Sequence, residues 1–323
     1  MPDHAYARTV PRDIKWAVAD RLRPVWVGDP NWRPSDDDKE HWRAHGWILI
    51  RNSVDHAAID RLKAEVQTYR ERHRTVTTNA TTGEGLRIGL LHAGIRLARE
   101  MGFNHQARTF LRWAFDEDPV LFGSLTFDIG SEQEPHIDAA FFYTQPETSM
   151  AGVWTAFEDI HEQSGPLFYV DGSHKWPRLK AADALAEAPE LKARLGARPT
   201  EPDRQLSDEV YRAYSAKLER VLTERSAVKS PAMLDKGDVF IWHPWLVHGG
   251  LPRVNRDLTR RSMVVHYIGA SARMWDQDSF FLRGDRLDQV PAIKHPIRKS
   301  RGRPYVWHPA PVNFSMGNGH FEA

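Results

Sequence analysis

The sequence predicts a mainly β protein with flanking helices, built as one domain over residues 1–323 around a β-barrel. A chain of 323 residues is long enough to bury the core of one elaborated barrel. Several short apolar runs, such as residues 239–242, have the length and composition of buried strands. Ahead of them, residues 55–73 carry apolar side chains at helical spacing, which predicts an amphipathic helix.

The N-terminal part begins with residues 1–34, which are rich in Pro, Trp and charge without a clear period. We expect them to form an extended arm laid on the body. Its candidate packing anchors are Trp16, Trp26 and Trp32. Ser35 can cap a short helix whose acidic first turn suits the positive end of the dipole, and Gly46 suits its end. Residues 47–50 then form a strand, followed by the amphipathic helix.

Residues 74–85 contain paired threonines and two glycines, which predicts a loop that is either a substrate lid or a plain connector. Two helices are expected next, over residues 86–98 and 105–115. His92 and Arg96 in the first of them either line a substrate pocket or lie on the surface. The barrel begins at Pro119, and residues 121–129 form its first strand.

The segment Pro135-His136-Ile137-Asp138 is the candidate for chemistry. Residues i and i+2 of an extended strand point to the same side, so His136 and Asp138 can reach one ion while Ile137 turns into packing. The best candidate for a third ligand is His248. Two histidines and one carboxylate match the facial triad of non-heme Fe(II) oxygenases, which leaves other positions on the metal open. Residues 139–143 continue a β-type run.

The middle of the chain combines strands with a helical insertion. Strands are expected over residues 154–157 and 166–170, with a tight turn at residues 172–174. The insertion covers residues 178–232, where Ser207 can cap a helix from residue 208 to about residue 225. Its apolar stripe consists of Val210, Tyr211, Tyr214, Leu218, Val221 and Leu222. This stripe packs on the barrel, forms a wall of the substrate pocket, or makes the contact of a homodimer.

Two further apolar segments follow the insertion. The strand over residues 239–242 leads to His248, and the two glycines after it let a backbone or a ligand come close. Residues 259–268 alternate as a strand that carries an arginine into the interior at its start. The planar guanidinium fork is suited to bidentate capture of a carboxylate.

The tail over residues 270–323 mixes aromatic side chains with Arg, Lys and Pro, and we expect it to wrap around the body. Its candidate anchors are Trp275, Phe280, Phe281 and Trp307. Either Arg283 or Arg286 could reach an anionic substrate from this tail.

Composition excludes several classes of protein. The hydrophobic content of 41% and charged content of 27% are ordinary for a globular chain. A net charge of +1 gives no electrostatic reason to expect a nucleic acid or an acidic membrane surface as partner. Without cysteine, the chain has no disulfides or thiolate metal sites. No apolar leader or apolar stretch near the ~20 residues of a membrane span is visible, so we expect a cytoplasmic protein without membrane contact.

A chain of short motifs resembles the phytanoyl-CoA dioxygenase family of Fe(II)- and 2-oxoglutarate-dependent oxygenases. The resemblance extends from about residue 35 to residue 268, is weak around residues 178–232 and is absent at both ends. The motifs are Gly130-Ser131-Glu132-Gln133, His136-Ile137-Asp138, Trp154-Thr155-Ala156-Phe157-Glu158-Asp159, Ser164-Gly165-Pro166-Leu167, Gly172-Ser173-His174-Lys175, Gly237-Asp238, His248-Gly249 and Arg260.

The resemblance implies a double-stranded β-helix, the jelly-roll, cupin-like barrel, with the metal in its mouth. It implies that His136, Asp138 and His248 bind Fe(II). The cofactor-binding residues that it implies for the co-substrate 2-oxoglutarate are Arg260, Trp154 and Thr126. Arg260 would pair with the distal carboxylate, with Arg261 as the neighbour that could be confused with it. The family often has a small hydroxyl residue after the His-Gly pair, where this chain has Gly250.

Three other histidines compete for the metal. His243 lies five residues before His248, but only His248 is followed by the glycine of the motif. The family places the segment around His174 in a turn away from iron, so a structural role is expected for it. His266, on the last strand, is interpreted as a core histidine.

The implied function is hydroxylation of a C–H bond of a small-molecule substrate, using O2 and releasing succinate and CO2. In halogenating relatives a small residue replaces the carboxylate ligand, so Asp138 argues against halogenation. Two alternatives stay open. One is a metal-dependent cupin-like enzyme that does not use 2-oxoglutarate, and the other is a non-catalytic binding relative.

Overall fold

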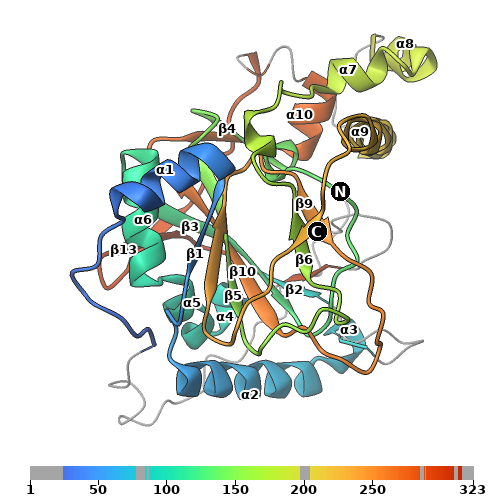
Figure 1. The fold of residues 1–323 in the computed structure, drawn as a ribbon. Helices are drawn as coiled ribbons and strands as arrows, with labels where there is room; N and C mark the ends of the chain where they lie inside the picture. Colours follow the sequence, from blue (N-terminus) through green and yellow to red (C-terminus); the bar gives the residue numbers. More distant parts are fainter. Residues whose placement is uncertain are drawn as a thin grey trace, which may run out of the picture.

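The computed structural model describes residues 25–77, 84–85, 87–196, 204–283, 287, 289–308 and 312–314. A nine-stranded sheet forms the centre of the molecule (Figure 1). Its main path is β1 (Trp47–Ile50), β8 (Val239–Trp242), β5 (Met150–Ala156), β10 (Ser262–Gly269), β3 (Pro119–Phe127), β13 (Arg303–Val306) and β12 (Ile297–Ser300). Off this path, β2 (Arg87–Gly89) pairs with β3 and with β14 (Val312–Phe314).

Two smaller sheets complete the β architecture. One consists of β7 (Ser230–Pro231), β6 (Leu167–Tyr169) and β9 (His248–Gly250), and the other of β4 (Phe142–Gln145) and β11 (Arg273–Asp276). The sheet with β6 and β9 lies opposite the large sheet (Figure 1), and Leu167 of β6 shares a buried cluster with Trp154 and Phe240. The arrangement is a double-stranded β-helix whose large sheet does not close on itself.

Strand β8 of the large sheet is buried on both faces. On β8, Val239 and Ile241 join the core on the helix side of the sheet, whereas Phe240 joins the cluster between the sheets. Successive side chains of a strand point to opposite faces, so this double burial requires apolar residues at every position. It explains why residues 239–242 are continuously apolar rather than alternating.

Helices cover the other face of the large sheet (Figure 1). They are α1 (Asp36–His45), α2 (His56–Arg72), α4 (Leu91–Gly94), α5 (Arg96–Gly102) and α6 (His105–Phe115), while the short α3 (Arg74–Thr77) follows α2. The predicted ends of α1 are confirmed. Ser35 and Asp38 form a reciprocal capping box at its start, and Gly46 adopts a left-handed conformation with φ of 81° at its end. Asp55 caps α2 through the backbone N–H of Ala58.

The insertion consists of α7 (Ala181–Leu185), α8 (Pro189–Gly196) and α9 (Arg204–Glu224). The expected stripe of α9 packs within the chain, where Tyr214 contacts Phe280 and Phe281 of α10 (Gln277–Arg283). The same cluster includes Val247, which lies just before β9. Ser207 lies inside α9 rather than at its cap, because the helix begins earlier than the sequence predicts.

Several predictions need correction or fall outside the described residues. Residues 86–98 do not form one helix, because the chain pairs with β3 as β2 and then turns through Leu90 at φ of 55°. Residues 139–143 begin with the 3-10 turn η2 (Asp138–Ala140) before β4 starts. Of the arm, Trp26 forms a bridge with Val54 and its indole N–H donates to the carbonyl of Glu100 at 3.2 Å. The predictions on Trp16, Arg286 and residues 78–83 lie outside the described residues.

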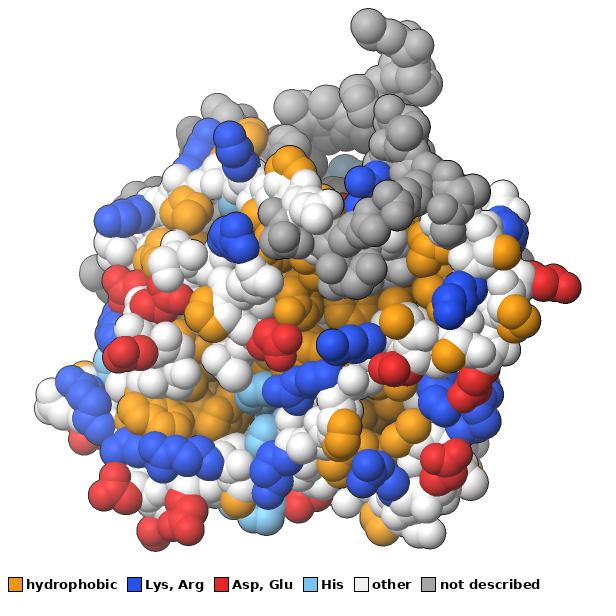
Figure 2. All heavy atoms as spheres, turned by 90° about the horizontal axis from the view of Figure 1, so that it is seen from above, with side chains coloured by type: hydrophobic (Ala, Val, Ile, Leu, Met, Phe, Trp, Pro, Cys, Tyr) orange, Lys and Arg blue, Asp and Glu red, His pale blue; other side chains and the backbone are white. Residues whose placement is uncertain are grey.

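The face of the molecule shown in Figure 2 carries mixed charge. On the face shown in Figure 2, the described acidic and basic side chains alternate with apolar ones rather than gathering in a field of one sign. In the part of the chain that the structure describes, no helix is long and apolar enough to cross a membrane.

Candidate metal centre

The structure brings His136, Asp138 and His248 together through the backbone. His136 and His248 form an antiparallel bridge in which each N–H donates to the other carbonyl, at 2.9 and 3.0 Å. Asp138 is the first residue of η2, and the next residue, Ala139, donates its N–H to the carbonyl of Pro244 at 3.0 Å. The same β pairing thus holds ligand residues that are far apart in the sequence.

The three side chains form a group that can hold a metal ion. Their ligand atoms all lie within 4.8 Å of one another, and the three residues are buried. The Oδ1 atom of Asp138 is 4.0 Å from Nε2 of His136 and 3.6 Å from Nε2 of His248. Two imidazoles and one carboxylate are the donor set of the facial triad, which binds through three protein ligands and leaves further positions for other molecules.

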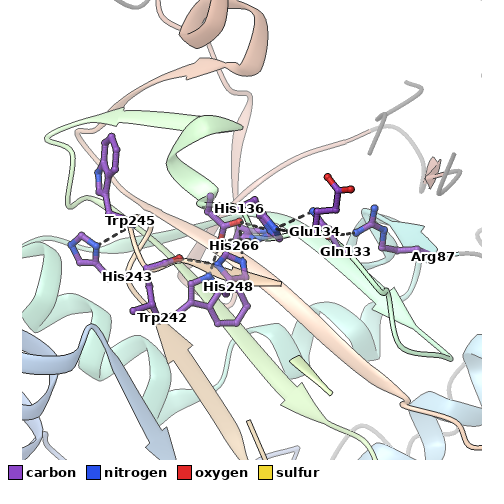
Figure 3. A network of polar contacts seen from close by, with 11 residues as sticks. Arg87, Gln133, Glu134, His136, Trp242, His243, Trp245, His248 and His266 are labelled. Atoms are coloured by element: carbon purple, nitrogen blue, oxygen red, sulfur yellow. Dashed lines mark hydrogen bonds and ion pairs between the residues drawn. The ribbon is translucent and has the colours of Figure 1, made fainter. Parts of the chain in front are cut away.

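The other ring nitrogen of each histidine is fixed by a backbone carbonyl (Figure 3). Nδ1–H of His136 donates to the carbonyl of Glu134 at 2.8 Å, and Nδ1–H of His248 donates to that of Leu246 at 2.9 Å. A carbonyl can only accept, so Nδ1 of each ring carries a proton and Nε2 is the nitrogen left to face a metal. Nε2 of His136 faces the side-chain amide of Gln133 at 3.3 Å, so this amide has to give way when a metal binds there.

The electrostatics of the site keep His136 and Asp138 in the states that metal binding requires. Burial and the nearby His248 lower the pKa of His136 to about 3, so this imidazole is neutral at pH 7. Burial acts to raise the pKa of Asp138, but the surrounding histidines and the indole of Trp242 hold it below its usual value. A neutral imidazole and an ionised carboxylate bind a metal without first losing a proton.

The three candidate ligands line an inner cavity with a volume of about 50 Å³. Arg260 and Trp154 line the same cavity. The guanidinium of Arg260 is 3% exposed and lies 5.0 Å from the ring of Phe127 and 5.4 Å from that of Trp154. Burial lowers the pKa of Arg260 to about 9, which leaves it charged at pH 7. Arg260 Nε and Trp154 Nε1 are buried donors without a hydrogen-bond partner. Such donors favour an anionic, hydrogen-bonding occupant.

The neighbouring Arg261 lies outside this cavity. Its side chain is 42% exposed and forms an ion pair with Glu158 at 3.4 Å. Both arginines precede β10, and the backbone N–H of Arg260 donates to the carbonyl of Asp128 at 2.9 Å. This contact ties the residue to the end of β3 and directs the two successive side chains to opposite sides.

Thr126 is not brought to the site. It is a buried residue of β3 whose neighbours Leu125 and Phe127 line the inner cavity. Side chains alternate along a strand, so Thr126 points to the helix side, where it is paired with Met263 of the helix-side core. The structure therefore places Thr126 away from the inner cavity, where 2-oxoglutarate is expected to bind.

The three competing histidines have different positions. Nδ1 of His243 accepts the backbone N–H of Trp245 at 3.2 Å, and His174 contacts the carbonyl of Arg43 at 3.2 Å. Neither belongs to the group that can hold a metal. His266 is buried as expected, but it lines the inner cavity with its Nε2 3.7 Å from Oδ2 of Asp138.

Sequence reasoning missed two polar residues at the site and misjudged one. Arg87 lines the inner cavity and donates to the side-chain oxygen of Gln133 at 3.2 Å, while the amide of Gln133 lies 3.3 Å from Nε2 of His136. Gln133 ends one of the motifs, so its position carried a signal, whereas Arg87 lay in a segment predicted to be helical.

His92 is fully buried on the helix side, where it contacts Ser124 at 2.7 Å.

A larger outer cleft of about 820 Å³ adjoins the inner cavity. Four residues line both, namely Arg87, Phe127, Ser131 and Gln133. One wall of the outer cleft is α9, which contributes Tyr211 and Ser215. Another includes Arg253, which forms an ion pair with Glu84 at 2.7 Å. The insertion therefore borders the approach to the metal centre.

Comparisons with known proteins bear on the family and the fold of this chain. The phytanoyl-CoA dioxygenase (PhyH) family matches over residues 42–262. A zebrafish (Danio rerio) phytanoyl-CoA dioxygenase domain-containing protein 1 is 50% identical over 46 residues, which cover 14% of this chain and 16% of that protein. The match thus spans about one sixth of that relative's length.

Two solved structures share the fold. EctD from S. alaskensis with bound Fe has a TM-score of 0.56 and 15% identity, covering 80% of this chain and 88% of its own. The epimerase SnoN in complex with Fe3+, alpha ketoglutarate and nogalamycin RO has a TM-score of 0.53 and 17% identity, covering 83% and 96%. The metal centre and the fold define a cupin-like protein with a facial triad. This chain belongs to the phytanoyl-CoA dioxygenase family.

Proposed function

We propose that this protein is an Fe(II)- and 2-oxoglutarate-dependent oxygenase that hydroxylates a C–H bond of a small molecule and releases succinate and CO2. The observation that carries the proposal is a buried His136, Asp138 and His248 group in one cavity with the buried Arg260. Membership of the family and a structural neighbour that holds iron and alpha ketoglutarate, the same compound as 2-oxoglutarate, support it.

The protein residues have distinct tasks in this proposal. His136 and His248 would hold Fe(II) through Nε2, and Asp138 through a carboxylate oxygen. Arg260 would neutralise the distal carboxylate of 2-oxoglutarate, with Trp154 packed beside it. When bound, iron, 2-oxoglutarate and O2 supply the oxidising chemistry. The buried walls of the cavity exclude water and hold the reactants in position.

The outer cleft is the proposed route and binding place of the substrate. It shares Arg87 and Gln133 with the metal cavity, so a molecule in it can approach the metal without coordinating it. Its walls carry both acidic and basic side chains, which fits a polar small molecule better than a nucleic acid. If Asp138 binds the metal, its carboxylate would take the position that a halide would need, which favours hydroxylation over halogenation.

An anaerobic titration of the metal-free protein with Fe(II) and then 2-oxoglutarate tests the cofactor half of the proposal. The weak visible charge-transfer band of the chelate should appear only with both ligands present. Arg260→Ala should raise the 2-oxoglutarate concentration at half-saturation by about tenfold or more, because a hydrogen bond to a charged group contributes roughly 1.5–3 kcal/mol. The matched control Arg261→Ala should leave it unchanged, because that side chain pairs with Glu158 outside the cavity.

Each other outcome has a definite meaning. Iron binding without the band would favour a metal-dependent enzyme that does not use 2-oxoglutarate. Loss of the band in Arg261→Ala instead of Arg260→Ala would show that the distal carboxylate pairs with Arg261 and not with Arg260. If neither ligand binds, the chain is a non-catalytic relative. Mass spectrometry of products from candidate substrates, with a search for a gain of one oxygen, tests hydroxylation itself.

A further inference from the structure

The two oxygens of Asp138 have different surroundings. Oδ1 faces the ligand nitrogens of His136 and His248, at 4.0 and 3.6 Å. Oδ2 accepts a hydrogen bond of 2.8 Å from the indole Nε1–H of Trp242, a residue that is 2% exposed (Figure 3). One oxygen is thus directed to the metal position and the other is occupied by a protein donor.

The indole of Trp242 is held in place by its surroundings. Trp242 on β8 is paired with Gly152 on β5, and a Cβ atom at Gly152 would lie 2.2 Å from two indole carbons. No side chain larger than a hydrogen fits at that position while the indole stays there. On another side, the ring centroid of Trp242 lies 5.0 Å from that of His248. The indole is therefore fixed between the sheet and a ligand ring, with its N–H directed at Asp138.

We propose that Trp242 is a positioning residue that keeps Asp138 coordinated through Oδ1 alone. A carboxylate can bind a metal through one oxygen or through both. A hydrogen bond to Oδ2 stabilises the one-oxygen mode, because two-oxygen binding would require breaking that bond inside a buried site. Single-oxygen binding leaves one more position on the metal open to other molecules. The inference rests on the proposed function only in that a metal binds to His136, Asp138 and His248.

Co(II), which reports its coordination by visible absorption, provides a test that needs neither substrate nor turnover. Trp242→Phe keeps an aromatic ring and removes the donor. We expect its Kd for Co(II) to rise by roughly tenfold or more, as is typical when an outer partner of a metal ligand is removed. We also expect the ligand-field bands to change in intensity, because a change in coordination number alters them. A purely structural role would lower thermal stability without changing the spectrum of the bound metal.

Trp245→Phe is the matched control. Trp245 is a buried tryptophan of the same segment, and its indole Nε1 has no hydrogen-bond partner. This variant loses the same atoms without touching Asp138, and should bind Co(II) with the Kd and spectrum of the parent. Far-UV circular dichroism checks the folding of each protein. A Trp242→Phe protein with the Kd and bands of the parent would overturn the proposal.

Gly152→Ala is a second route to the same question if Trp242→Phe does not fold. It leaves the donor in the chain but displaces the indole, so it should weaken Co(II) binding and change the bands in the same direction. Parent-like binding by a folded Gly152→Ala protein would count against the proposal. Failure of the parent itself to bind Co(II) would instead overturn the metal site on which the proposed function depends, which separates the two conclusions.

Discussion

Single atoms decide what the metal centre can do. A backbone carbonyl holds the Nδ1 proton of His136 and another holds that of His248, so each ring presents Nε2 before any metal arrives. Burial keeps the pKa of His136 far below its usual value, which prevents a proton from competing with the metal at neutral pH. The site is thus organised in advance, and metal binding requires little rearrangement of these two rings.

Replacement of either ligand histidine should abolish turnover. His136→Ala and His248→Ala each remove one of three protein ligands, so 2-oxoglutarate-dependent formation of succinate with Fe(II) should fall to background. His243→Ala is the matched control, since that imidazole accepts a hydrogen bond from Trp245 and lies outside the metal group. Succinate assays on proteins with parent-like circular dichroism decide the matter. Full activity in either ligand variant would contradict the assignment.

The sequence indicates which three residues come together at the candidate metal centre, but not all of their partners. The spacing of His136 and Asp138 and the glycine after His248 are features of neighbouring residues, so they can be recognised in the sequence alone. The hydrogen bond from Trp242 to Asp138 joins residues that are far apart in the sequence. Only the pairing of the strands brings them together. Thr126 was misplaced for a related reason, because a shift of one residue along a strand moves a side chain to the other face.

At the scale of elements, the sequence predicts those whose ends carry chemical signals. Helix α1 has its cap at Ser35 and its left-handed end at Gly46, and both ends lie where they were predicted. The segment of residues 86–98 has good helix formers but no such signals. There β2 pairs with β3 and with β14, and this long-range pairing outweighs the local preference for helix.

The cap of α1 makes a measurable contribution. The Oγ atom of Ser35 accepts the backbone N–H of Asp38, and Ser35→Ala leaves that donor to water. We expect the free energy of unfolding in urea to fall by about 1 kcal/mol. Ser35→Asp, which retains an acceptor at the same place, should stay within a few tenths of the parent. Equal losses in both variants would mean that the hydroxyl acts through something other than the cap.

At the scale of the whole molecule, buried neutral histidines couple stability to pH. Burial lowers the pKa of His92 and His243, as of His136, to about 3 in the folded protein. Unfolded histidines have a pKa of about 6.5, so between these values the unfolded chain binds protons that the folded chain does not. Stability contributed by these groups is present above pH 6.5 and is lost as the pH falls below it.

The metal-free protein should therefore lose stability between pH 7 and pH 5, a range in which carboxylates change little. Urea unfolding at several pH values should give a free energy of unfolding that decreases as the pH is lowered. Its slope against pH should correspond to the uptake of up to one proton on unfolding for each buried histidine. His243→Gln should reduce that slope by up to one proton while leaving the other two histidines in place. A free energy of unfolding that is independent of pH across this range would contradict the burial argument.

The backbone bridge between His136 and His248 has a consequence for how such proteins can diversify. The chain between these two ligands includes α7, α8 and α9, and its ends are fastened together by two hydrogen bonds at the metal centre. The entropic cost of closing a loop rises only slowly with its length. The three helices lie between β6 and β7, which pair with each other, so a change in their length should leave the pairing of His136 with His248 intact. The helical wall of the outer cleft can therefore vary, while the frame that carries His136, Asp138 and His248 stays the same.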